Sequence, residues 1–133
     1  MRAVGVNSYG GPEALEVVQV PSQDAGPGEV RLRIYAAAVN PTDTLARNGS
    51  RAEAQKIDLP PYVPGMDAAG IVDQVGTHVT TGIKVGDSAM AMIVPRGNRG
   101  AYRESLVLKA EQVVPSPKGF THAEVCTLPM NGL

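Results

Sequence analysis

The stretch Pro64-Gly65-Met66-Asp67-Ala68-Ala69-Gly70-Ile71-Val72 decides how this chain folds. A proline–glycine turn leads directly into small and β-branched residues, a pattern that predicts a strand over Ala68–Val75. Gly70 stands inside this strand, and an interior glycine usually marks a bulge or the close approach of another backbone segment. We therefore expect a strand with a bulge or a tight backbone contact at Gly70.

Further short strands are predicted on both sides of this stretch, separated by turns. The chain has 15 Gly and 11 Pro among its 133 residues, and they punctuate runs of strand-forming residues. The strands are expected at Arg2–Val6, Leu15–Val20, Val30–Ala38, Ser88–Val94, Ala101–Leu108 and Val113-Val114. A hairpin-type turn is expected at Gly97-Asn98-Arg99-Gly100. Strands this short and this closely spaced favour an all-β barrel or sandwich.

One short helix is predicted directly after the third strand. Asn40 is a good N-cap residue, Pro41 suits the first helical position, and Asp43 places a carboxylate at the third. Gly49 supplies the stop. The next segment, Arg51–Leu59, has no clear periodicity and is expected to be an exposed loop.

A second helix is predicted near the end of the chain. Thr121 and Glu124 form a Thr-x-x-Glu capping box, and Pro129 is expected to break or kink the helix that follows. The chain ends soon afterwards in uncharged residues, Met130-Asn131-Gly132-Leu133. Because domain ends are usually polar and loose, we expect this end to be cut from a longer protein.

In order and spacing, these motifs resemble the GroES-like domain of the medium-chain dehydrogenases/reductases. The resemblance is carried by residues 64–72, by Val75-Gly76 and by Val85-Gly86-Asp87. Residues that resemble the quinone oxidoreductase branch are Ala36–Asp43, Gly100-Ala101-Tyr102, Val113-Val114-Pro115 and Leu128-Pro129. The resemblance covers essentially the whole chain. It implies a mainly β fold, a GroES-like partly open β-barrel with two or three short helices, spanning residues 1–133.

The same resemblance implies a second, Rossmann-type domain that binds the nucleotide, and the chain contains no sign of it. It has no G-x-G-x-x-G motif, and Gly26-Pro27-Gly28 runs into Glu29 and Val30 where a third glycine is needed. We therefore expect NADPH to be bound mainly by a domain absent from this chain, and the isolated chain to be inactive.

No zinc site is expected. Zinc-dependent members of the resembled family carry a Cys near the position of Asn40 and Gly-His-Glu where this chain has Gly65-Met66-Asp67. A catalytic zinc needs about three Cys, His or carboxylate ligands, and a structural zinc needs four. The single Cys126 cannot supply these, and it is expected to be an inert helix residue.

The candidate site residues are Asn40, Pro41, Asp43, Tyr62 and Met66. Asn40 either donates a hydrogen bond to a substrate carbonyl or nicotinamide amide, or only caps its helix. Asp43 either lies near the cleft, as in the family, or stabilises the helix start. Tyr62 either offers a proton or shapes the pocket, or packs on Pro60-Pro61. Met66 either lines an apolar pocket or fills the core.

Roles are also expected for one carboxylate and two arginines near these motifs. Asp67 is expected either to remain at the former metal corner or to bond local backbone amides. Arg96 and Arg99 flank a turn and are expected to be solvated.

The expected function is hydride transfer from NADPH to a quinone or enone, with Asn40 the best catalytic candidate. Without a Lewis acid, a conjugated acceptor is the easier substrate because the developing charge is delocalised. The alternatives are an enoyl reductase domain acting on acyl thioesters, and a stand-alone GroES-like binding or assembly module without catalysis. A net charge of −1 argues against nucleic acid, and no apolar run suits a signal peptide or membrane span. A cytoplasmic protein, homodimeric when intact, is expected.

Overall fold

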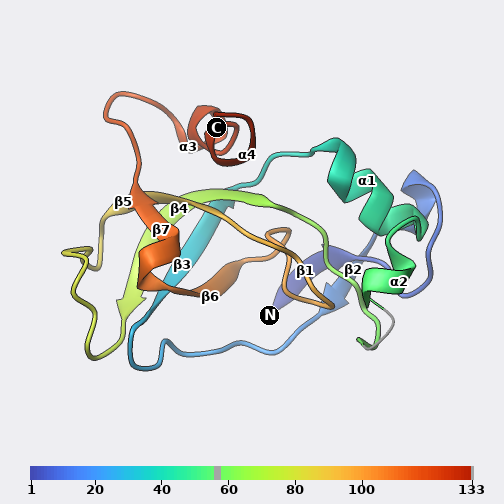
Figure 1. The fold of residues 1–133 in the computed structure, drawn as a ribbon, viewed down its shortest axis with the longest axis horizontal. Coiled ribbons are helices and arrows are strands. Elements are labelled where there is room, and N and C mark those ends of the chain that lie inside the picture. Colours follow the sequence, from blue (N-terminus) through green and yellow to red (C-terminus); the bar gives the residue numbers. More distant parts are fainter. Residues whose placement is uncertain (56–57, 133) are drawn as a thin grey trace.

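Alternating apolar residues build β3 (Glu29–Ala36), the strand that lies between β4 and β6 in the main sheet. The computed structural model describes residues 1–55 and 58–132. Five antiparallel strands form a curled sheet in the order β6–β3–β4–β5–β7 (Figure 1). The other members of this sheet are β4 (Asp67–Val75), β5 (Ser88–Met92), β6 (Ser105–Lys109) and β7 (Val113–Pro115). The predicted mainly β, partly open barrel is confirmed.

A separate two-stranded ribbon, β1 (Arg2–Gly5) with β2 (Glu16–Gln19), lies beside the sheet. Isolated bridges from Ala3 to Arg103 and from Val6 to Tyr62 join it to the rest of the fold. The helical segments are η1 (Pro12–Ala14), α1 (Pro41–Asn48), α2 (Ala52–Gln55), η2 (Ala110–Gln112), α3 (His122–Val125) and α4 (Leu128–Asn131). In Figure 1, α1 and α2 lie near the ribbon, whereas α3 and α4 lie at the top of the view, against the strands of the main sheet.

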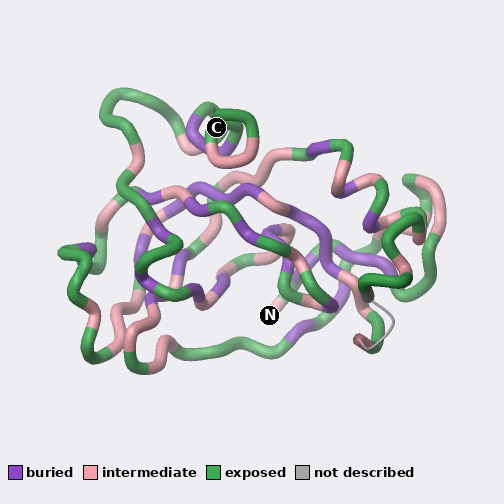
Figure 2. The backbone as a smooth tube through the Cα atoms, in the orientation of Figure 1, coloured by how far each residue is buried: buried purple, intermediate pink, exposed green. Residues whose placement is uncertain are grey.

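The core lies within the curl of the sheet, where the buried segments in Figure 2 converge. Val30, Leu32 and Val72 are fully buried there. Each such side chain contributes roughly 1.5–3 kcal/mol by leaving water. A second cluster under the ribbon contains Ala3, Val18, Val20 and Val63, and a third, of Ala69, Val125 and Cys126, joins α3 to β4.

Gly70 has the close backbone contact that its place in β4 predicts. A Cβ atom at this position would overlap the carbonyl oxygen of Arg33 on β3. The pairing of β3 with β4 also shifts register between Ile34 and Ala36, directly beside Gly70. Both the bulge and the tight contact therefore occur here, because only a residue without a side chain lets β3 approach this far.

The first helix follows its prediction closely, and the segment after it does not. α1 begins at Pro41 and ends before Gly49, which takes the left-handed conformation with φ 87°. Arg51–Leu59 was expected to be a loop, but α2 occupies Ala52–Gln55. Two alanines in this turn favour helix strongly enough to form it without an amphipathic pattern. Residues 56–57 lie outside the described part of the chain.

Two other predictions are wrong in detail. Residues 97–100 do turn the chain, but they do not form a hairpin, because β6 pairs with β3 and not with β5. The strand after this turn begins only at Ser105, since residues 101–104 pass beside β1. The last predicted helix breaks before Pro129, at Cys126 and Thr127, and Pro129 lies in the first turn of α4. Proline is well tolerated at that position.

Candidate active site

The start of β4, the start of α1 and the short helix α4 meet around one buried polar pair. Asn40 Nδ2 donates a hydrogen bond of 2.6 Å to Asp67 Oδ2. Asn40 is 6% exposed and Asp67 is 0% exposed. Because a carboxylate accepts but does not donate, this bond fixes the orientation of the Asn40 amide. Asn40 Oδ1 in turn accepts a 3.2 Å hydrogen bond from Asn131 Nδ2 on α4.

The second oxygen of Asp67 is also used. Asp67 Oδ1 accepts a 2.7 Å hydrogen bond from the backbone N–H of Met130 in α4. Hydrogen bonds to an ionised carboxylate are about twice as strong as those between neutral groups. Asp67 therefore ties α4 to the sheet and holds Asn40 at the same time. This is a larger role than the local backbone bonding expected from sequence.

Asp43 stabilises the start of α1 rather than lining an open cleft. It is 3% exposed, and its Oδ2 accepts a 2.8 Å hydrogen bond from the backbone N–H of Asn40. Its Oδ1 accepts a 2.9 Å bond from the N–H of Gly65. The carboxylate thus joins the N-cap of α1 to the turn that precedes β4. Pro41 occupies the first turn of the same helix.

Tyr102 lies close to these carboxylates, although the sequence did not single it out as a site residue. Its hydroxyl donates a 3.2 Å hydrogen bond to the carbonyl oxygen of Ala38. Burial raises the pKa of Tyr102 strongly, and the nearby Asp43 and Asp67 carboxylates raise it further. The phenol therefore stays protonated through the physiological range.

Met66 lines a pocket, which is one of the two roles expected for it. Its sulfur accepts a hydrogen bond from Thr42 Oγ1 at 2.9 Å, which holds the side chain against α1. The pocket has a volume of about 230 Å³ and lies between α1, α2 and residues 94–96. Met66 therefore lines this pocket, while the next residue in the chain, Asp67, belongs to the buried pair.

Tyr62 lies apart from the Asn40–Asp67 pair. Its ring stacks on Tyr9, with ring centroids 5.1 Å apart and planes 9° from parallel. Its hydroxyl donates a 3.0 Å hydrogen bond to the carbonyl oxygen of Asp58. In this arrangement the Tyr62 proton is engaged with the backbone.

The structure thus brings Asn40, Pro41 and Asp43 together and places Met66 beside them. Asn131 was not predicted to belong to this group. The sequence shows only that Asn131 is an amide among the uncharged residues at the end of the chain. This does not indicate which residue it contacts. Only the return of α4 onto β4 reveals the contact.

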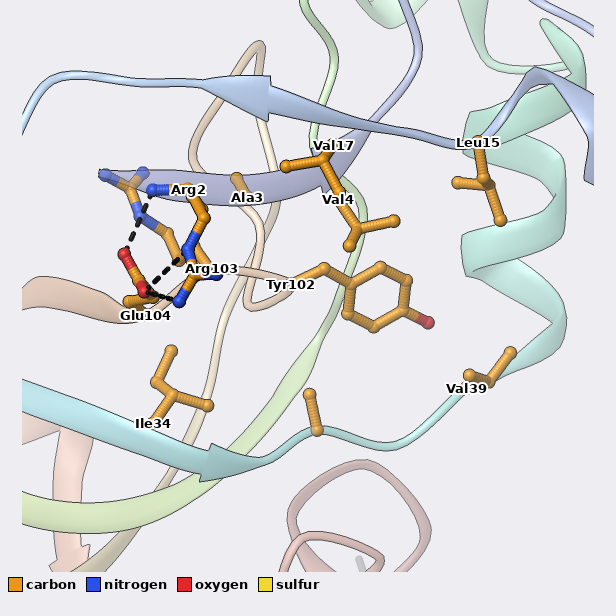
Figure 3. Close-up of a pocket in the computed structure, with 11 residues that line it drawn as sticks. Arg2, Ala3, Val4, Leu15, Val17, Ile34, Val39, Tyr102, Arg103 and Glu104 are labelled. Carbon is orange, nitrogen blue, oxygen red and sulfur yellow. Dashed lines mark hydrogen bonds and ion pairs between the residues drawn. The ribbon is translucent and has the colours of Figure 1, made fainter.

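A larger apolar groove of about 600 Å³ lies elsewhere, between the β1–β2 ribbon and the end of β3 (Figure 3). Val4, Val17 and Val39 line it, and Tyr102 lies in it between the ribbon and the strand. Arg2 and Glu104 form an ion pair of 2.7 Å at its rim. Apart from the Tyr102 hydroxyl, which donates to the carbonyl oxygen of Ala38, and charged side chains near the rim, the lining is apolar.

The donors around Asn40 are poor ligands for zinc. At the positions where zinc-dependent members of the resembled family carry their ligands, this chain has a carboxylate, an amide and a thioether. Zinc prefers Cys, His and carboxylate ligands. Within residues 1–55 and 58–132, no three His, Cys, Asp or Glu side chains are grouped so that they could hold a metal ion. Cys126 is buried, and burial first and Asp67 second raise its pKa. This thiol is suited to packing, not nucleophilic attack.

The described residues form a half-barrel in which Asn40, at the start of α1, and Asp67, at the start of β4, meet as a buried amide–carboxylate pair. Residues 26–118 match the alcohol dehydrogenase GroES-like domain. The chain belongs to this family, in the quinone oxidoreductase branch of the medium-chain dehydrogenases/reductases.

Relatives of known name agree in sequence over most of the chain. A quinone oxidoreductase of Pseudomonas aeruginosa is 36% identical over 95% of this chain and 36% of its own length. The quinone oxidoreductase of Lama guanicoe is 34% identical over 77% of this chain and 30% of its own. The human synaptic vesicle membrane protein VAT-1 homolog-like is 31% identical over 98% of this chain and 29% of its own.

Solved structures agree equally well. The quinone oxidoreductase from Coxiella burnetii superposes with a TM-score of 0.88 at 25% identity, over 99% of this chain and 42% of that one. The Escherichia coli quinone oxidoreductase complexed with NADPH gives 0.76 at 26%, over 95% and 36%. The JamJ enoyl reductase gives 0.84 at 25%, over 97% and 39%. The chain thus spans about a third of the length of its relatives.

None of the helices in the described ranges is both long and apolar enough to cross a membrane.

Proposed function

We propose that this chain forms the substrate-side domain of an NADPH-dependent reductase that delivers hydride to the conjugated carbonyl of a quinone or enone. Two relatives in sequence carry the name quinone oxidoreductase, and one similar structure was solved with NADPH. The nucleotide would be held mainly by a Rossmann domain on polypeptide outside residues 1–133. We also propose that the protein is cytoplasmic.

The observation that carries the proposal is the direct bond between Asn40 and Asp67. In the zinc-dependent pattern the ligand positions are those of Asn40 and Met66, whereas here the Asn40 amide bonds to the neighbouring carboxylate of Asp67 at 2.6 Å. When bound, the nicotinamide supplies the hydride. The domain then has only to bind and orient the acceptor and to stabilise the negative charge that develops on its oxygen.

The chain offers two suitable groups for that charge. One N–H of the Asn40 amide bonds to Asp67, and its second N–H remains available as a donor. The N-terminus of α1, where Asn40 is the cap, places partial positive charge beside it. Delocalisation over a conjugated acceptor lowers the demand on these groups, so a quinone or enone is favoured over a simple ketone.

The test is an assay of the full-length protein that contains this chain. NADPH oxidation would be followed with 1,4-benzoquinone, with 3-penten-2-one and with crotonyl-CoA. We expect turnover of the quinone or the enone, at least a tenfold loss of kcat in Asn40→Ala, and no loss in Asn48→Ala on the same helix. Stoichiometric zinc, or inactivation by a chelator, would contradict the proposal.

The proposal that NADPH binds mainly outside residues 1–133 can be tested on the 133-residue chain itself. Titration with NADPH, followed by the fluorescence of the nucleotide, should show no binding tighter than about 1 mM, or about 4 kcal/mol. Micromolar binding would mean that the nucleotide site lies within residues 1–133.

A second candidate is an enoyl reductase domain acting on acyl thioesters, which the likeness to the JamJ enoyl reductase favours. The same assay separates the two, because an enoyl reductase would prefer crotonyl-CoA by an order of magnitude or more.

A further inference from the structure

The pocket beside Met66 combines apolar walls with two arginines. Its walls come from Ala46 on α1, from Met66, and from Val94 and Pro95 in the segment after β5. Arg51, which precedes α2, and Arg96 also line it, and both are exposed to solvent. The pocket begins two residues after Asn40, at Thr42, and one residue before Asp67, at Met66. Two of its lining residues, Thr42 and Met66, are therefore close neighbours in sequence of the residues of the candidate active site.

Neither guanidinium has a carboxylate partner in the described ranges, 1–55 and 58–132. The ion pairs there are formed by Arg2 and Arg31. Among the carboxylates of this region, Asp43 is buried and bonded to two backbone N–H groups, and Glu53 has an interaction of its own. Two unpaired cations at one small pocket repel each other, and an anion between them relieves that repulsion.

The volume limits what fits. A pocket of about 230 Å³ is large enough for a small aromatic or acyl group. Thr42 Oγ1 gives its proton to Met66, so it holds the apolar wall in place and is not a donor toward a ligand. The arginines are then the groups that select the charged end of the ligand.

Resting on the function proposed above, we infer that this pocket is a specificity subsite for an acceptor that carries an anionic group on a small apolar body. Arg51 and Arg96 bind the anion, and Met66 with its neighbours packs against the apolar part. A carboxylate and a phosphate monoester share this chemistry, and guanidinium groups bind either one with paired hydrogen bonds. The subsite requires no catalytic role for either arginine.

The test is a binding measurement on the 133-residue chain without nucleotide. Backbone amide chemical shifts would be followed while 4-oxo-4-phenylbutanoate, its neutral amide 4-oxo-4-phenylbutanamide, or phenyl phosphate is added. We expect the carboxylate or the phosphate to bind at least tenfold more tightly than the neutral amide, with shifts at Thr42, Arg51 and Met66. The anion that binds more tightly identifies the charged group of the substrate.

The control is an arginine on the same turn that does not line this pocket. Arg51→Gln and Arg96→Gln should each weaken binding of the anion about fivefold or more, whereas Arg99→Gln should leave it unchanged. Equal affinity for the anion and the neutral amide, or an equal effect of Arg99→Gln, would overturn the inference. Because no hydride is transferred, the result does not depend on whether the full-length protein reduces quinones.

Discussion

Asp67 has a larger role in the structure than a turn residue that bonds only local backbone amides. Its carboxylate is fully buried and accepts hydrogen bonds from Asn40 Nδ2 and from the N–H of Met130. Replacing it by alanine leaves the buried Asn40 amide and the partly buried N–H of Met130 without this acceptor. A buried donor that loses its partner costs about 1–3 kcal/mol.

We expect Asp67→Ala to lower the free energy of unfolding by about 3 kcal/mol, measured by urea denaturation, because one buried and one partly buried donor lose their acceptor group. Asp67→Asn should cost less, since its amide can still accept one bond and the Asn40 amide can turn around. The control is Asp73→Ala, which removes a partly exposed ion pair with Arg31 and should cost less than about 1 kcal/mol. Equal losses in Asp67→Ala and Asp73→Ala would show that the buried pair is unimportant for stability.

Tyr102 provides a prediction about pH. Burial, with the Asp43 and Asp67 carboxylates, raises its pKa above the ordinary tyrosine value. A group whose pKa is raised on folding stabilises the fold below its unfolded pKa, near 10, and this contribution is lost as pH rises through the folded value. Stability should therefore decline above about pH 10, where the unfolded chain ionises first.

The measurement is a spectrophotometric titration of the phenols. The chain has four tyrosines, and we expect one of them to ionise only at a pH well above the others or on unfolding. Tyr102→Phe should remove this late step and reduce the number of titrating phenols by one. If Tyr102→Phe instead removed one of the phenols that ionise at lower pH, the Tyr102 phenol would not be held protonated by its surroundings.

Among the strands, the contact at Gly70 is the most sensitive to substitution. The carbonyl of Arg33 fills the space in which a Cβ would lie, and backbone cannot move aside as a side chain does. We expect Gly70→Ala to cost about 3 kcal/mol or more, at the upper end for overpacking, because β3 must move away from β4. The midpoint of urea unfolding would report it.

A matched control is Gly26→Ala. There the added methyl group meets the flexible carboxylate of Glu29, so the cost should stay below about 1 kcal/mol. A small effect at both positions would mean that the two strands can separate at Gly70 without loss.

Local signals in the sequence were enough to predict most elements but not how the elements meet. Caps and stops predicted α1 because Pro41 and Gly49 act through their own backbone angles. The turn at residues 97–100 was also found, yet the pairing of β6 with β3 depends on contacts across the whole sheet. The roles of Asp67 and Asn131 could not be predicted either, since their partners lie 27 and 91 residues away from them in the chain.

At the scale of the whole molecule, the groove under the ribbon leaves apolar side chains in water. Val17 and Val39 are 67% and 74% exposed on opposite sides of it. We expect the folded chain to enhance the fluorescence of 8-anilinonaphthalene-1-sulfonate, because the groove offers this dye an apolar surface of suitable size. Val17→Lys and Val39→Lys should each reduce the enhancement by about half or more.

Val114→Lys serves as the control, since this valine is also exposed but lies on β7, away from the groove. It should leave the fluorescence unchanged. If all three variants behaved alike, the dye would be reporting general loosening of the chain.

The four residues of α4 shield the Asn40 amide while burying none of their own side chains. Hydrogen bonds from Met130 and Asn131, with little apolar area, keep this short helix in place. Lifting it away would break these bonds and would expose the Asn40 amide and the Asp67 carboxylate to water together. A change in the position of α4 would therefore be felt directly at the Asn40 amide, through its hydrogen bond from Asn131.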